Sequence, residues 1–170
     1  MGSSTGLDRI TWVTGGQTGI DRAVLDFCLK HRLRCGGWCP ENRQAEDGPI
    51  DRRYPLQPLP GAGYRERTFA NVKDSDAIVI LYFASLSGGT RYSHEVARQL
   101  GKPLLMLNLA SLQPADAAAR LRTFLQAYAP SSVNISGPRK SEWKEGYGQC
   151  QNLLKRIFDS GYSERQNTLN

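Results

Sequence analysis

Three glycine-rich segments of this 170-residue chain carry the residue types best suited to binding an anion. The first has the sequence TGGQTGIDR over residues 14–22, the second SGGT over 87–90 and the third SGPRKS over 136–141. Glycine lets a backbone approach a ligand closely, and a helix N-terminus offers unpaired amides and a positive dipole end. The three segments therefore predict a site for a phosphate or another oxyanion.

The predicted ligand-binding residues come from all three segments and from the helix that follows the second. They are Gly15, Gly16, Gln17, Thr18, Gly19, Asp21, Arg22, Ser87, Gly88, Gly89, Thr90, Glu95, Gly137, Pro138 and Arg139. Arg91 and Lys140 could add charge, since basic side chains, and above all the planar fork of arginine, suit phosphate. Each segment alone also suits a tight turn with a helix cap, for which Thr18 and Thr90 are candidates.

Alternating strand and helix patterns predict where these segments lie. Runs of β-branched and apolar residues predict strands over 9–14, 35–39, 76–83, 103–109 and 132–136. Helical spacing predicts helices over 18–32, 64–75, 90–100, 114–128 and 141–158. The alternation predicts a Rossmann-like α/β three-layer sandwich with a mainly parallel sheet of five or slightly more strands. Strand-to-helix turns share one edge of such a sheet, so the three loops should line one crevice.

The segment 40–63 contains five of the nine prolines and has no clear period. Loops of this length are often functional, which favours a lid over the crevice. Arg43, Glu46 and Asp47 are its candidate ligand contacts, although simple solvation of a surface loop explains the same residues. We expect a single ligand-binding domain over 9–158, a flexible N-terminus over 1–8 and a polar C-terminal tail over 159–170.

The composition narrows the class of protein. The net charge of +6 suits an anionic ligand, but the basic residues are too scattered to predict binding to nucleic acid. The sequence contains neither a membrane-length apolar stretch nor the apolar core of a signal peptide, so we expect a cytoplasmic protein. The cysteines lack metal-binding spacing with the two histidines, which predicts buried thiols and no protein-bound metal; they are Cys28, Cys35, Cys39 and Cys150.

A longer ordered series of motifs resembles a known family. It comprises GGQTGIDR at 15–22, GGWCP at 36–40, RQAEDGPI at 43–50, YPL at 54–56, RT at 67–68, NV at 71–72, DSD at 74–76, LSGGT at 86–90 and GPR at 137–139. The series spans about residues 10–158 and resembles the molybdenum carrier (molybdenum cofactor carrier) family. That family is a circularly permuted branch of the lysine-decarboxylase-like (LOG/SLOG) Rossmann superfamily.

The resemblance implies a binding protein that carries the molybdenum cofactor as cargo and performs no chemical step. The cofactor is a pterin with dithiolene-held molybdenum and a terminal phosphate. Its anionic groups suit helix N-termini and arginines, and its flat pterin suits shielding by a lid loop. The dithiolene already supplies sulfur, so the resemblance requires no cysteine ligand. It also implies molybdoenzymes as recipients and a homo-oligomer.

Two alternatives come from the wider superfamily, which resembles the cytokinin-activating phosphoribohydrolases with their P-G-G-x-G-T-x-x-E motif. The corresponding stretch here, SGGTRYSHE at 87–95, lacks the proline, has a displaced glycine and has a longer gap before Glu95. In a nucleoside 5′-monophosphate phosphoribohydrolase, Glu95 would activate water or stabilise the oxocarbenium ion, with Arg91, Arg22 or Arg139 anchoring phosphate. A nucleotide-sensing module without turnover is the second alternative.

Overall fold

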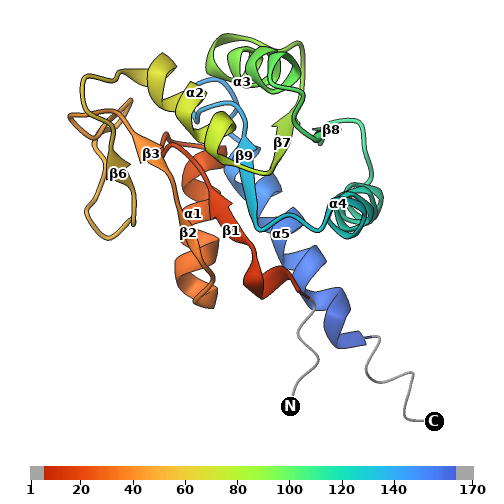
Figure 1. Cartoon of the computed structure of the whole chain (residues 1–170). Coiled ribbons are helices and arrows are strands. Elements are labelled where there is room, and N and C mark those ends of the chain that lie inside the picture. The colour runs from red at the N-terminus through yellow and green to blue at the C-terminus, as the bar shows by residue number, and fades with distance from the viewer. Residues whose placement is uncertain (1–5, 164–170) are drawn as a thin grey trace.

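Five parallel strands form the central sheet of the computed structural model, which describes residues 6–163 (Figure 1). Their order across the sheet is β2-β1-β9-β7-β8. The strands are β1 (Thr11–Val13), β2 (Cys35–Gly36), β7 (Ala77–Tyr82), β8 (Leu104–Asn108) and β9 (Ser132–Ser136). This sheet and its flanking helices confirm the predicted Rossmann-like α/β fold.

Helices cover both faces of the sheet, which gives the three layers of the predicted sandwich. One face carries α1 (Ile20–His31), α4 (Pro114–Tyr128) and α5 (Gly146–Ser163), whereas the other carries α2 (Tyr64–Asp74) and α3 (Gly88–Gln99). The strand β7 contributes side chains to the hydrophobic cores on both faces of the sheet. Val79 and Leu81 pack against the first helix layer, whereas Ile78 and Ile80 pack against the second. A strand buried on both faces is almost continuously apolar, as β7 is.

The predicted strand over 35–39 divides into two short strands. Gly37 adopts a φ of +133°, and a Cβ at this position would lie 2.1 Å from the carbonyl oxygen of Thr14. The chain therefore turns after β2, and β3 (Trp38–Cys39) leaves the central sheet to pair with β6 (Gln57–Pro58). A two-residue strand carries too little pattern to separate these pieces in the sequence.

The long segment 40–63 contains a small antiparallel hairpin. Its strands are β4 (Gln44–Ala45) and β5 (Gly48–Pro49), so residues 46 and 47 form its tip. Ala45 and Ile50 anchor the hairpin in a separate apolar cluster with Leu25, Tyr54 and Leu56. The root of the predicted lid is therefore packed, and its tip is polar.

Helical structure extends past both ends of the predicted domain. A short 3-10 helix, Leu7–Arg9, buries Leu7, and α5 continues to Ser163, so residue 158 lies within a helix. Residues 1–5 of the predicted flexible N-terminus and residues 164–170 of the predicted polar tail lie outside the described residues. Within 6–163, no helix is both long and apolar enough to span a membrane.

The helix α5 also begins five residues later than predicted, at Gly146 rather than at residue 141. The intervening turn is held by the amides of Glu142 and Trp143, which both donate to the carbonyl of Arg139 at 3.0 Å. The Trp143 ring is buried and stacks on Phe83 with 5.0 Å between centroids. This packing fixes the third glycine-rich loop to the end of β7.

Candidate functional site

The first and third glycine-rich loops lie in direct contact. They follow the adjacent strands β1 and β9, and Ile20 N–H donates to the carbonyl of Pro138 at 3.4 Å. The amide of Lys140 donates to Thr18 Oγ1 at 3.1 Å. Gly19 has a φ of +78°, and a Cβ there would lie 2.6 Å from the carbonyl oxygen of Pro138. Only glycine tolerates both the positive φ and the close approach of this carbonyl, so the contact explains why the first motif has a glycine at position 19.

The second loop lies near the same region because it approaches the turn that follows the third loop. It follows β7, the neighbour of β9, and a Cβ at Gly88 would lie 3.6 Å from the Glu142 carboxylate. The helix α3 starts at Gly88 with Ser87 as its N-cap, so Thr90 is a buried residue of the first turn and not the cap. Among the described residues, no side chain caps this helix. Its first amides keep the donor capacity of an open helix N-terminus.

The side chain of Asp21 accepts hydrogen bonds from two backbone amides of the first loop, to which it belongs. Its Oδ2 accepts the amides of Gly15 and Gln17, each at 3.2 Å. Burial raises the pKa of the Asp21 carboxyl, and the guanidinium of Arg67 and these two amides offset only part of that rise. In this structure the Asp21 carboxylate therefore holds these two amides, and its predicted contact with a ligand stays a prediction.

Arg67 is a residue of the site that the strand-end argument missed. It belongs to α2, and its Nη1 lies 3.6 Å from Asp21 Oδ2. The guanidinium packs directly on the first loop, since a Cβ at Gly15 would lie 1.9 Å from Nη1. Its Nε is buried and has no hydrogen-bond partner within the described part of the chain. Its sequence signal was its place in the family-like series, because α2 follows β6, which is not a strand of the central sheet.

The hairpin tip brings Glu46 onto the junction of the first and third loops. Its carboxylate accepts the hydroxyl of Thr18, the amide of Ser141 at 3.1 Å and the hydroxyl of Ser141 at 2.5 Å. Arg139 Nε lies 3.8 Å away. Although burial raises the pKa of Glu46, the bonds from Ser141 and Thr18 and the charge of Arg139 bring it below its ordinary value. Ser141 was not among the predicted binding residues, although it ends the third motif.

The other tip residue, Asp47, holds Arg22. The two side chains form a bidentate pair, with both contacts at 3.2 Å. Arg22 also donates from Nε and Nη2 to the carbonyl of Gly16, at 3.3 and 3.2 Å. The side chain of Gln17 adds a further link, because its Oε1 accepts the amides of Thr18 and Glu46. The tip of the β4–β5 hairpin and the first loop are therefore joined by several polar contacts.

Arg43 supports the base of the hairpin within the segment 40–63. Its guanidinium donates to four main-chain carbonyls at 2.8–3.2 Å, those of Ile50, Asp51, Tyr54 and Leu56. Carbonyls in an irregular loop need such partners, and the five donors of arginine supply several at once. These bonds give Arg43 a role in shaping the loop, and its predicted contact with a ligand stays a prediction.

The residues of the hydrolase alternative lie on the outer face of α3. Glu95 pairs with Arg91 one turn earlier, with 3.7 Å between Oε1 and Nε. Both side chains are more than half exposed, at 59% and 65%. Exposed pairs of this kind contribute little energy and leave both groups well solvated.

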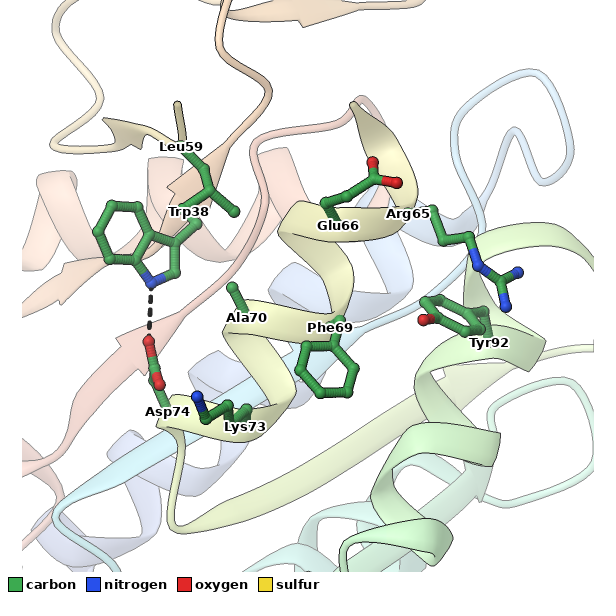
Figure 2. A pocket seen from close by; sticks show the side chains of 9 residues that line it. All are labelled: Trp38, Leu59, Arg65, Glu66, Phe69, Ala70, Lys73, Asp74 and Tyr92. Atoms are coloured by element: carbon green, nitrogen blue, oxygen red, sulfur yellow. Dashed lines mark hydrogen bonds between the residues drawn. The ribbon is translucent and has the colours of Figure 1, made fainter. Parts of the chain in front are cut away.

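A hollow of about 450 Å³ lies over the outer side of α2, away from the three glycine-rich loops. Figure 2 shows Trp38 and Tyr92 on either side of this helix, with Phe69 and Ala70 between them. Asp74 accepts the Trp38 indole N–H at 2.9 Å, as the dashed line in Figure 2 marks. The guanidinium of Arg65 stacks 3.9 Å above the Tyr92 ring. We call this hollow the α2 groove; Leu59, Glu66 and Lys73 complete its lining.

The cysteines are free thiols in this structure. Cys28, Cys39 and Cys150 are buried and Cys35 is half-buried. Burial raises the pKa of Cys39 and that of Cys150, which disfavours their thiolates. Over residues 6–163, no group of three or more His, Cys, Asp or Glu side chains is arranged to hold a metal ion.

Comparisons with known proteins place the chain in a family. A solved structure named "Putative molybdenum carrier protein" from Syntrophus aciditrophicus SB superposes with a TM-score of 0.84 at 37% sequence identity. The match covers 86% of this chain and 93% of that one. No curated protein matches the chain. The model of the circularly permutated YpsA SLOG family matches residues 12–158, which is most of the chain, and the chain therefore belongs to that family.

Proposed function

We propose that this protein binds the molybdenum cofactor as cargo and seats the cofactor's phosphate in the crevice between the first and third glycine-rich loops. The observation that carries the proposal is the set of donors that converge on one carboxylate there, those of Thr18, Ser141 and Arg139. Hydroxyls, an amide and a guanidinium are the groups that bind phosphate in proteins. The name of the similar structure from Syntrophus aciditrophicus supports the choice of cargo.

Two further features support an anionic guest in this crevice. Arg67 lies against Gly15 with a buried Nε that lacks a partner among the described residues, so it has a donor in reserve. The start of α3 lies beside the third loop with no side-chain cap, and helix N-termini favour negative charge. We expect the hairpin over 44–49 to shield the bound pterin, and we expect a homo-oligomer that delivers cargo to a molybdoenzyme.

The carrier proposal is tested by retention and protection of the cofactor. The purified protein is mixed anaerobically with cofactor released from a molybdoenzyme, passed through a desalting column and analysed for molybdenum and pterin. We expect retained cofactor, slower oxidation in air and transfer to an apo-molybdoenzyme. The double variant Ser141→Ala/Arg139→Gln should lose retention, whereas Arg65→Met in the α2 groove should keep it. Failure of the wild-type protein to retain cofactor or to slow its decay would refute the proposal.

A further inference from the structure

The strongest feature beyond the proposed function is a carboxylate of the protein itself in the anion-binding crevice. Glu46 takes hydrogen bonds from the hydroxyl of Thr18 and from the amide and hydroxyl of Ser141, and Arg139 lies 3.8 Å away. These four groups all donate, so together they form a seat for a negatively charged oxygen. The seat is filled by a residue from the lid, more than ninety positions away from Ser141 and Arg139 in the sequence.

We infer that Glu46 is an internal competitor: a phosphate-bearing ligand enters this seat by displacing the Glu46 carboxylate, which swings out with the hairpin tip. The inference rests on the proposed function, because it specifies how the same crevice is opened. It assigns the oxyanion subsite to Thr18, Ser141 and Arg139. The inference also gives the β4–β5 hairpin two states. In the closed state the Glu46 carboxylate occupies the seat, and in the open state the ligand occupies it.

The seat is organised independently of Glu46. Thr18 Oγ1 accepts the Lys140 amide at 3.1 Å, so its single hydrogen is free to point toward the crevice. The close contact at Gly19 fixes the third loop against the first, which sets the position of Ser141. When the carboxylate leaves, these donors therefore stay in place. The hydroxyl of Thr18, a buried residue, then needs a new acceptor, because a buried donor without one is costly. Ser141 and Arg139 are exposed, and Arg139 also pairs with Glu142 at 3.5 Å, so these groups stay available to an incoming anion.

A phosphate makes a better occupant than a carboxylate. Phosphate carries more negative charge and offers three terminal oxygens, so it can accept from both hydroxyls, the amide and Arg139 at once. Glu46 compensates by being tethered, because a group on a short tether acts at an effective concentration of the order of millimolar. The apparent Kd of any free anion is therefore its intrinsic Kd divided by the fraction of time that the seat is open.

The test compares phosphate binding to matched variants of the full chain. Isothermal titration with inorganic phosphate is done on wild type, Glu46→Gln, Glu46→Ala and Glu41→Gln. Glu41 is an exposed residue of the same long loop, so its variant makes the same chemical change outside the seat. We expect both Glu46 variants to bind phosphate at least about threefold more tightly than wild type. Glu41→Gln should stay within about twofold of wild type, and Ser141→Ala should cancel the gain when added to Glu46→Gln.

Other outcomes are equally informative. Weaker or unchanged phosphate binding by the Glu46 variants would overturn the inference, since Glu46 would then contact the ligand or have no part in binding. An equal gain in phosphate affinity in Glu41→Gln would mean that the loss of any negative charge in the loop produces the effect. That result would also overturn the inference. If no variant binds phosphate, the seat itself is refuted. The cofactor-retention assay measures the carrier proposal separately, so the two failures can be told apart.

Hydrogen–deuterium exchange gives a second measurement on the wild-type protein. Displacement of Glu46 frees the hairpin tip, so phosphate should speed amide exchange over residues 44–49 while it slows exchange over 138–142. Slower exchange in both segments would mean that the lid closes over the ligand with Glu46 in place. That result, or no change in the hairpin, would contradict displacement.

Discussion

The crevice and the α2 groove both take residues from α2, but their charged side chains differ in burial and in partners. In the crevice, Arg67 of α2 is 13% exposed, and the carboxylate it pairs with is 7% exposed. In the groove, Arg65 of the same helix lies on the Tyr92 ring, and the carboxylate of Asp74 accepts an indole N–H. Donors in the crevice converge from distant segments on one point, whereas those in the groove are spread along an aromatic surface. This convergence of donors, and not the volume of a hollow, is the basis on which we propose the anion site.

The largest expected effect separates two arginines of α2. Arg67→Met leaves the Asp21 carboxylate buried without its cation, so we expect a loss of about 3 kcal/mol in the free energy of unfolding. Arg65→Met removes only an exposed stacking contact and should cost at most about 1 kcal/mol. Urea denaturation followed by circular dichroism measures both. Equal losses would mean that the crevice is no more tightly organised than the groove.

The contact between the first and third loops should be the next most sensitive feature. Gly19→Ala forces a Cβ toward the Pro138 carbonyl at a positive φ, which we expect to cost about 2 kcal/mol. The matched control is Gly148→Ala within α5, where a Cβ meets no atom within 4 Å and helix propensity improves. The difference in urea midpoint between the two variants checks the expectation. A tolerant Gly19 would show that the loops can separate.

The closed hairpin should depend on pH through Glu46. Its pKa is lowered from 4.5 in the folded protein, so its contribution to stability is present above about pH 4.5 and is lost as the pH falls through the folded pKa. We expect Glu46→Gln to be less stable than wild type by about 1 kcal/mol at pH 7 and nearly equal to it at low pH. The raised pKa of Asp21 is common to both proteins and cancels in the difference. A gap that stays constant with pH would contradict an ionised Glu46 in the seat.

The groove should make little difference to anion binding. Lys73→Ala removes a positive charge from its lining, yet phosphate affinity should change less than about twofold because exposed charges outside the crevice are screened. Titration at 0.15 M salt, with Arg139→Gln as the comparison, measures this. A larger effect of Lys73→Ala than of Arg139→Gln would move the anion site to the groove.

The smallest expected effect concerns Glu95. Glu95→Gln breaks an exposed pair with Arg91 and should change neither phosphate affinity nor stability by more than about 0.5 kcal/mol. We also expect no release of adenine when the wild-type protein is incubated with AMP, measured by liquid chromatography. Release of adenine that disappears in Glu95→Gln would favour the phosphoribohydrolase alternative over a carrier.

Local patterns were sufficient to predict the layers of this fold. The apolar run of β7 predicted a strand covered on both faces, and the alternation of strands with helices predicted a parallel sheet. The short strands β4 to β6 were missed, and β3 was merged with β2 in one predicted strand, because two residues carry no detectable period. The late start of α5 was missed because the packing of Trp143 against Phe83, and not helix propensity, decides where the third loop ends.

The sequence by itself determined that glycine-rich turns follow β1, β7 and β9, since glycine, β-branched runs and helical spacing are local properties of the chain. Only the tertiary structure decided which groups meet at those turns. Asp21 and Arg67, or Glu46 and Ser141, are brought together by strand order and by the fold of the lid. Charge pairing depends on distance in space, and the distance between residues far apart in a sequence is set by packing of the whole domain.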